Sequence, residues 1–244
     1  MAHVTVDPSL PPPATTAVGI SRRAAAMQAS PLRKLAAAAE TRKKQGIRVY
    51  HLNIGQPDLP TAPEVFETIR SLNLPTIAYA PSNGMPAAIA AWKAYFAGFG
   101  IDFDEREIIV TTGGSEAIIF ALSAIADADE EVIVFEPFYT NYNGFATLAN
   151  VRLRPISLSI ENGFHLPPRE TIERHVGPKT RGSLVCSPAN PTGTVYAREE
   201  MQSLVDVVRD RGLFLLADEV YREFAYDAPF TSIMEFPEIR DRAV

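Results

Sequence analysis

The second half of the chain alternates short apolar runs with segments of helical periodicity, and this alternation constrains the fold more than any other feature. The apolar runs have the length of buried strands and lie at 108–111, 132–135, 151–156, 184–187 and 213–217. The segments between them place apolar residues on one helical face and lie at 115–126, 142–148, 168–175 and 198–211. Such alternation favours parallel strands joined by right-handed crossovers. The sequence therefore predicts an α/β fold with a doubly wound, mostly parallel sheet.

Polar side chains stand where two of the predicted strands end. Asp218 and Tyr221 follow the run 213–217, and Asn190 follows the run 184–187. Ligands of open α/β sheets bind beyond the carboxyl ends of the strands, so these residues are candidates for one ligand site. Glu219 would point to the opposite face from Asp218, so the pair does not suggest a two-carboxylate hydrolase.

A buried, unpaired Asp218 carboxylate would be costly, so this residue needs a cationic partner. A protonated pyridine nitrogen is one such partner, and an arginine or lysine side chain is another. Asn190 and Tyr221 could both hydrogen-bond a phenolate-type oxygen, or could serve in turns and caps.

The loop 111–115 links a predicted strand to a predicted helix and contains Gly113 and Gly114. Glycines permit close approach to a ligand, and the free N–H groups of a helix start attract phosphate. The loop fits neither the GxGxxG nor the Walker A pattern, and a tight turn with Ser115 as helix cap explains it equally well. Tyr139, after the next strand, could stack on a flat heterocycle or pack in the core.

Composition narrows the function classes. Hydrophobic residues make up 46% of 244, which favours a folded chain, and a net charge of −6 gives no reason to expect nucleic-acid binding. The single cysteine, Cys186, excludes a disulfide within the chain and favours a reducing compartment, with Cys186 as a small buried hydrophobe. No apolar run is long enough to span a membrane or to resemble a signal peptide, so we expect a cytoplasmic protein. The four histidines lack metal-site spacing.

The first half of the chain is less regular. Residues 1–19 are rich in Pro, Thr and Ala and predict a flexible leader. A helix should start at Ser30-Pro31 and stop at Gly46, a short strand should cover 49–53, and further helices should begin at Pro63 and Pro86. We expect Trp92 to face inward from the last of these helices.

Six motifs occur in an order and spacing that resemble the class I/II aminotransferases, which are fold-type I pyridoxal-phosphate enzymes. They are NIGQPD at 53–58, Tyr79 with Gly84, TGGS at 112–115, PFY at 137–139, SPANPTG at 187–193 and DEVY at 218–221. The resemblance runs from about Ser21 to the end of the chain. It implies a leader at 1–20, an N-terminal segment of the small domain at 21–60, and a partial cofactor-binding large domain at 61–244.

The resemblance also implies roles for single residues. Asp218 would pair with the pyridinium nitrogen of pyridoxal 5'-phosphate, and Asn190 and Tyr221 would hydrogen-bond its ring oxygen. Tyr139 would stack on its ring, and the backbone N–H groups of Gly114 and Ser115 would hold its phosphate.

Two further roles concern the partner subunit and the substrate. Tyr79 would reach the phosphate of the neighbouring subunit's cofactor, which implies a homodimer. Gly55 would lie against the substrate carboxylate.

The sequence departs from the family in its lysines. The family's Schiff-base lysine lies in a Ser-x-Ser-Lys type segment beyond DEVY, whereas the lysines here are Lys34, Lys43, Lys44, Lys93 and Lys179. The resemblance therefore implies the N-terminal portion of an aminotransferase, with no catalytic residue of its own and inactive alone. The strand at 108–111 would lack its neighbour and the edge of 184–187 would lie open, so we expect poor stability of this chain alone.

The implied activity is transfer of an amino group from an amino acid to a 2-oxo acid. Three alternatives remain: a lyase or synthase that uses the same cofactor and fold, a non-catalytic fragment that serves at most as an interaction module, and a nucleotide-binding α/β domain.

Overall fold

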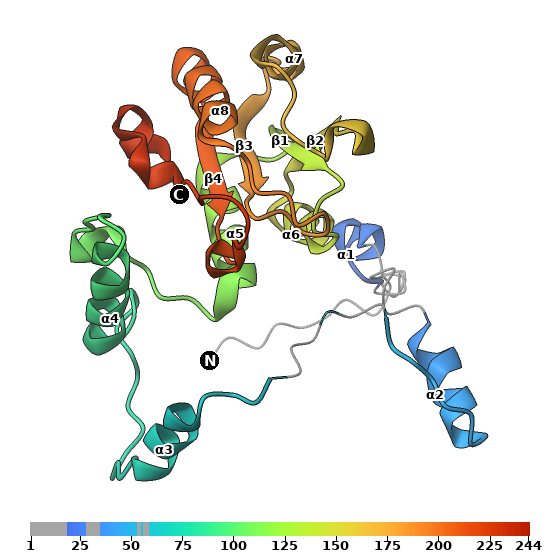
Figure 1. Cartoon of the computed structure of the whole chain (residues 1–244), viewed down its shortest axis with the longest axis vertical. Helices are drawn as coiled ribbons and strands as arrows, with labels where there is room; N and C mark the ends of the chain where they lie inside the picture. Colours follow the sequence, from blue (N-terminus) through green and yellow to red (C-terminus); the bar gives the residue numbers. More distant parts are fainter. Residues whose placement is uncertain (1–18, 28–34, 53–54, 56–58) are drawn as a thin grey trace, which may run out of the picture.

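The computed structural model describes residues 19–27, 35–52, 55 and 59–244, and its centre is a four-stranded parallel sheet (Figure 1). The strands run in the order β2-β1-β3-β4, and all three neighbouring pairs are parallel. Their bounds are β1 Glu131–Glu136, β2 Arg152–Ser157, β3 Thr180–Cys186 and β4 Phe214–Asp218. The prediction of an α/β fold with a parallel sheet is confirmed.

One helix follows each of the first three strands and returns the chain to the next. These connecting helices are α6 (Asn141–Ala149), α7 (Arg169–His175) and α8 (Arg198–Arg211), and α5 (Gly113–Ile125) precedes β1. Helix α8 ends where Gly212 adopts a φ of +64°, a left-handed conformation that glycine accepts without strain. The helix places Met201, Leu204 and Val208 in the core.

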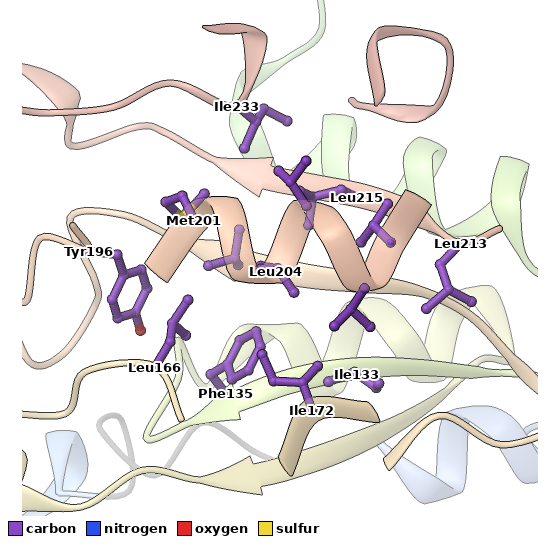
Figure 2. Close-up of a cluster of buried hydrophobic side chains, with 14 of the residues drawn as sticks. Ile133, Phe135, Leu166, Ile172, Tyr196, Met201, Leu204, Leu213, Leu215 and Ile233 are labelled. Atoms are coloured by element: carbon purple, nitrogen blue, oxygen red, sulfur yellow. The ribbon is translucent and has the colours of Figure 1, made fainter. Parts of the chain in front are cut away.

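The strands alternate their side chains between two separate apolar cores. On one face Ile133, Phe135 and Leu215 pack with α7, α8 and the 3-10 helices η5 (Ile233–Glu235) and η6 (Pro237–Arg242), as Figure 2 shows in part. On the other face Val134, Leu184 and Leu216 pack with α5 and α6. A sheet covered on both sides explains why its strands read as continuous apolar runs.

Two predicted strands do not form. Residues 108–111 carry no strand, and the amide of Val110 donates instead to the carbonyl of Asn83 at 3.0 Å. Residues 49–52 are also irregular, and Asn53 lies outside the described residues. Apolar content gave both segments a strand pattern, but a strand also needs a neighbour with which to pair.

The expected open edge at 184–187 is wrong, because β1 and β4 pair with β3 on either side. The edge strands of the sheet are β2 and β4, and at the outer edge of β4 Ala243 forms a parallel bridge with Leu215. The carbonyl of Val244 accepts from the amide of Ala217 at 2.8 Å, so a further pairing starts on this edge.

The N-terminal helices stand largely apart from the sheet in Figure 1. Their bounds are α1 Arg22–Ala26, α2 Ala36–Lys44, α3 Pro63–Ser71 and α4 Pro86–Ala97, and two 3-10 turns, η2 (Glu105–Glu107) and η3 (Ile160–Asn162), lie further on. Helix α1 lies beside α6, where Met27 Cε would be 3.4 Å from a Cβ on Gly144. The predicted inward Trp92 is wrong, because this side chain is 48% exposed.

Several predictions for the first half of the chain are not tested. Residues 1–18 of the leader predicted at 1–20, and the helix start predicted at Ser30-Pro31, lie outside the described residues. The division of the chain into a leader, a small-domain segment and a large domain, with boundaries after residues 20 and 60, stays a prediction.

Candidate functional site

A cavity of about 210 Å³ opens at the carboxyl ends of β3 and β4, beside the N-terminus of α5. It is lined by Gly114, Ser115, Ile118, Tyr139, Phe145, Cys186, Asn190, Asp218, Val220 and Tyr221. Six of the eight residues singled out from the sequence meet here. They come from four separate segments of the chain, and parallel strands bring such segments to one edge of the sheet.

The Asp218 carboxylate forms one wall of the cavity. Its Oδ2 atom accepts from the Tyr142 hydroxyl at 2.6 Å, and its Oδ1 atom accepts from the Val220 amide at 3.3 Å. Asp218 is in register with Cys186 on the neighbouring strand. Each carboxylate oxygen can accept more than one hydrogen bond, so Asp218 can also bind a cationic donor in the cavity.

The start of α5 forms an anion-binding end of the cavity. Gly113 has a φ of +77°, and a Cβ on Gly113 or Gly114 would meet no atom within 4 Å. The Glu116 carboxylate accepts from the Thr112 amide at 2.6 Å. The amides of Gly114 and Ser115 belong to the first helical turn, whose N–H groups have no partner within a helix. The free N–H groups and the positive dipole end of a helix start suit a phosphate group.

Tyr139 supplies an aromatic wall whose position is fixed by its neighbours. Its hydroxyl accepts from the Asn141 side-chain amide at 2.7 Å. Its ring lies edge-on to Tyr142, with centroids 5.5 Å apart, and to Phe145, with centroids 6.5 Å apart. A held aromatic ring beside a cavity can stack on a flat ligand.

Asn190 and Tyr221 lie together on a further side of the cavity. The Asn190 Nδ2 atom is 3.4 Å from the Tyr221 hydroxyl. Both were predicted to bond one ligand oxygen, and this proximity is compatible with that role.

Two predicted residues lie elsewhere. Tyr79 is fully exposed and Gly55 is exposed, and neither lines the cavity. Among the lysines in the described part of the chain, Lys43, Lys44, Lys93 and Lys179, none lines the cavity.

Sequence reasoning missed Tyr142 and placed Cys186 only as a strand residue. Tyr142 lies in the first turn of α6, three residues after Tyr139, in the same aromatic stretch that the sequence had already singled out. Burial raises the pKa of the Cys186 thiol to about 11, and the nearby Asp218 charge adds to this shift. The thiol therefore stays protonated near neutral pH, which disfavours Cys186 as a nucleophile.

Glu219 points to the opposite face of β4 and anchors the strand end. Its carboxylate accepts from the Ser232 hydroxyl at 2.9 Å and from the Ile233 amide at 2.9 Å. Burial raises the pKa of Glu219, while these donors and Arg222 act in the opposite direction. Because successive residues point to opposite faces, the Asp218 carboxylate faces the cavity, whereas the Glu219 carboxylate bonds to the segment that contains Ser232 and Ile233.

Arg222 ties the loop after β4 to helix α4. Its side chain is 9% exposed, and its guanidinium lies 4.1 Å from the Phe99 ring centroid and 5.4 Å from that of Phe96. Glu219 is its carboxylate neighbour at 3.9 Å. These contacts hold the backbone next to Tyr221.

A second hollow of about 370 Å³ lies beside this loop and is larger than the first. Its walls include Trp92, Tyr95, Phe96, Glu219 and Val244. It lies against the outer edge of β4 rather than beyond the strand ends, so we place the functional site in the smaller cavity.

Replacing Ser232 with alanine should lower the free energy of unfolding by about 1–3 kcal/mol, since a buried acceptor on Glu219 loses its donor. Ser232 is 1% exposed and also caps η5 by accepting from the Met234 amide at 3.2 Å. Urea denaturation measures the change. The matched control is Ser159→Ala, because Ser159 caps η3 but is exposed. An equal loss in both variants would contradict the anchoring role of Ser232.

Within the described residues, no three His, Cys, Asp or Glu side chains gather closely enough to hold a metal ion. None of the helices in the described ranges has the length and apolar character needed to cross a membrane.

Comparison with known proteins gives one consistent result. The family described as aminotransferase class I and II matches residues 47–242. An aspartate aminotransferase of Thermotoga maritima is 33% identical over 229 residues, which are 92% of this chain and 60% of that protein. An aspartate/prephenate aminotransferase of Thermus thermophilus is 33% identical over 211 residues, 86% of this chain and 54% of the relative.

Solved structures agree with the sequence matches. An aspartate aminotransferase of Thermus thermophilus with maleate superposes with a TM-score of 0.84 at 31% identity, covering 93% of this chain and 59% of that one. The enzyme from Rhizobium meliloti gives a TM-score of 0.86 at 26% identity, covering 93% and 57%. The chain thus spans only about half to three-fifths of the length of the proteins it matches.

Proposed function

The chain belongs to the class I and II aminotransferases, and from this premise we propose that the protein containing it transfers an amino group from an amino acid to a 2-oxo acid. The observation that carries the proposal is the meeting of Asp218, Tyr139 and the start of α5 around one cavity. These three provide a carboxylate for a ring cation, an aromatic wall and an anion-binding helix end.

The cavity residues fit pyridoxal 5'-phosphate, which we propose as cofactor. The amides of Gly114 and Ser115 would hold its phosphate, and Asp218 its protonated ring nitrogen. Asn190 and Tyr221 would hydrogen-bond the ring oxygen, and Tyr139 would stack on the ring. When bound, the cofactor supplies an electron sink for the carbanion formed when a substrate loses its α-proton.

The residues of this chain act in the proposed reaction by binding and orientation. Asp218 maintains a negative charge where the ring nitrogen would lie, and this charge favours the protonated nitrogen. Asn190 and Tyr221 fix the angle of the ring. The relatives are longer than this chain, and part of their length has no counterpart in it. We assign the lysine that moves the α-proton to that further part of the protein.

The remaining assignments extend the same proposal. Tyr79, exposed on the surface, would reach the phosphate in a partner subunit of a homodimer, and Gly55 would lie against the substrate carboxylate. Residues 21–60 would belong to the small domain and 61–244 to the large domain. We propose a cytoplasmic location. Aspartate is the first substrate to test, because relatives carry it in their names and one was solved with maleate, a dicarboxylate.

The test is visible absorbance of the protein containing this chain during titration with pyridoxal phosphate. A visible band should appear on binding, and aspartate should remove it until a 2-oxo acid is added. A band that the amino acid leaves unchanged would contradict amino transfer. Release of ammonia from the amino acid, without a response of the band to the 2-oxo acid, would indicate a lyase. Binding of nucleotides in place of pyridoxal phosphate would indicate the nucleotide-binding alternative.

Borohydride reduction followed by peptide mapping tests the assignment of the lysine. We expect the cofactor to be fixed to a lysine outside the printed residues. Labelling of Lys34, Lys43, Lys44, Lys93 or Lys179 would show that assignment to be wrong. A protein that takes up no pyridoxal phosphate would leave the non-catalytic alternative.

A further inference from the structure

Tyr142 lies directly behind the wall of the cavity and touches the residue proposed to hold the ring nitrogen. It belongs to α6, is 1% exposed and does not itself line the cavity. Its hydroxyl donates to Asp218 Oδ2 at 2.6 Å, between residues 76 positions apart in the chain. A ligand in the cavity would therefore meet Asp218 but not Tyr142.

The Asp218 carboxylate is held at both of its oxygens. The Val220 amide donates to Oδ1 at 3.3 Å, and this bond comes from the same turn of the chain. The Tyr142 bond to Oδ2 is shorter and comes from another element, so it fixes the rotation of the carboxylate relative to α6. Each oxygen retains acceptor capacity, which a ring N–H in the cavity can use.

Tyr142 is a permanent donor in this position. Burial raises the pKa of its phenol far above the usual range, and the neighbouring Cys186 and Asp218 raise it further. The hydroxyl therefore keeps its proton throughout the range in which proteins are folded. A neutral phenol beside a carboxylate can only donate.

The ring of Tyr142 is itself fixed by aromatic neighbours. It lies edge-on to Tyr139, with centroids 5.5 Å apart and an interplanar angle of 88°. It also stacks on Phe138, with centroids 6.1 Å apart and an angle of 16°. One side chain thus contacts both the aromatic wall and the carboxylate of the cavity.

We propose that Tyr142 is a positioning residue that orients the Asp218 carboxylate toward the ring nitrogen of the cofactor. The inference rests on the proposed function, because it assumes that the group bound by Asp218 is a protonated pyridine nitrogen. Tyr142 acts through Asp218 and touches neither cofactor nor substrate. The competing explanation is that Tyr142 only fills the core.

The test is Tyr142→Phe, measured as the dissociation constant of pyridoxal phosphate for the protein containing this chain. We expect binding to weaken about 3- to 10-fold, since part of a hydrogen bond to a charged group is lost. In an Asp218→Ala background the same change should have little further effect, because the side chain that Tyr142 orients is gone. An equal loss in both backgrounds would overturn the proposal.

Inorganic phosphate separates a positioning role from general loss of structure. Phosphate would occupy only the start of α5, so its inhibition constant against pyridoxal phosphate should be the same in native protein and Tyr142→Phe. Tyr196→Phe is the matched control, because Tyr196 is 3% exposed and its hydroxyl has no hydrogen bond among the described residues. Equal weakening of phosphate and cofactor would show that Tyr142 only fills the core.

A cycle of unfolding free energies for Tyr142→Phe and Asp218→Ala without cofactor measures the hydrogen bond itself, because alanine removes the acceptor, whereas an asparagine oxygen would still accept from the Tyr142 hydroxyl. Additive losses would show that the bond does not form and would overturn the proposal. Failure of the native protein to bind pyridoxal phosphate would overturn the proposed function and with it the positioning role. If the native protein binds no pyridoxal phosphate but the unfolding cycle is non-additive, the bond between Tyr142 and Asp218 stabilises the fold and has no role in cofactor binding.

Discussion

Replacing Asp218 with asparagine should weaken binding of pyridoxal phosphate about 10- to 100-fold. The amide keeps the shape of the side chain but removes the negative charge, and a charge-assisted hydrogen bond contributes about 1.5–3 kcal/mol. Amino transfer should fall further than binding does, because a neutral ring is a weaker electron sink. Titration of the visible band gives the dissociation constant, and the aspartate-dependent loss of that band gives the rate.

The control for this prediction is the neighbouring carboxylate. Glu219→Gln alters a side chain of the same charge on the opposite face of β4, where it bonds to Ser232 and Ile233. It should change the free energy of unfolding and leave cofactor affinity within about 2-fold of native, since a side chain on that face does not meet the cavity. Equal loss of affinity in both variants would show that net charge, rather than the position of Asp218, controls binding.

Replacing Gly182 with alanine should lower the free energy of unfolding by about 1–3 kcal/mol, the usual cost of overpacking a filled interior. A Cβ at Gly182 would lie 2.8 Å from the carbonyl oxygen of Phe214 and 3.1 Å from Ile125 Cδ1. The carbonyl belongs to β4, which is paired with β3 at this register, so it can move only if the strand moves. Cofactor affinity should fall as well, because β4 ends in Asp218. Urea denaturation and titration of the visible band measure the two effects.

Gly177→Ala is the matched control for Gly182→Ala. Its added Cβ would meet first the Nη1 atom of Arg154 at 3.3 Å, which is the end of a flexible side chain. We expect a change within about 0.5 kcal/mol, because the Arg154 side chain can move aside although Gly177 is half-buried. Comparable destabilisation by both alanines would mean that the close approach of β3 and β4 is not what restricts Gly182.

The convergence of the cavity residues followed from the sequence because it depends on one topological rule. The polar residues after two strands and the glycine loop before a helix were expected at one sheet edge, since parallel strands end on the same side. Asp218, Asn190 and Tyr221 lie there, as does the start of α5. Their roles toward a cofactor stay predictions.

The failed predictions share a physical cause, which is that a local pattern does not identify its partner. The segment 108–111 has strand composition, yet Val110 bonds only to the Asn83 carbonyl and no ladder forms. Trp92 sits on an apolar helix but faces a hollow rather than a filled core. Tyr142 was not singled out from the sequence, because its bond to Asp218 joins elements that are distant in sequence.

The expected instability of this chain alone also depends on partners. Within the described residues, the outer edge of β4 pairs only with residues 243–244, through Leu215 and Ala217. An edge with unpaired backbone groups can pair with another chain. The prediction of poor stability stays open to a test by concentration-dependent unfolding.

The position of Trp92 gives the molecule a built-in optical reporter. It is the single tryptophan of the sequence, is 48% exposed and lies at the wall of the larger hollow, edge-on to Tyr95 with centroids 5.6 Å apart. Its fluorescence will therefore respond when the hollow or the face of α4 is covered. Since the proposed cofactor would give the cavity a visible band of its own, covering of the hollow and loading of the cavity would be followed in the same sample at two wavelengths.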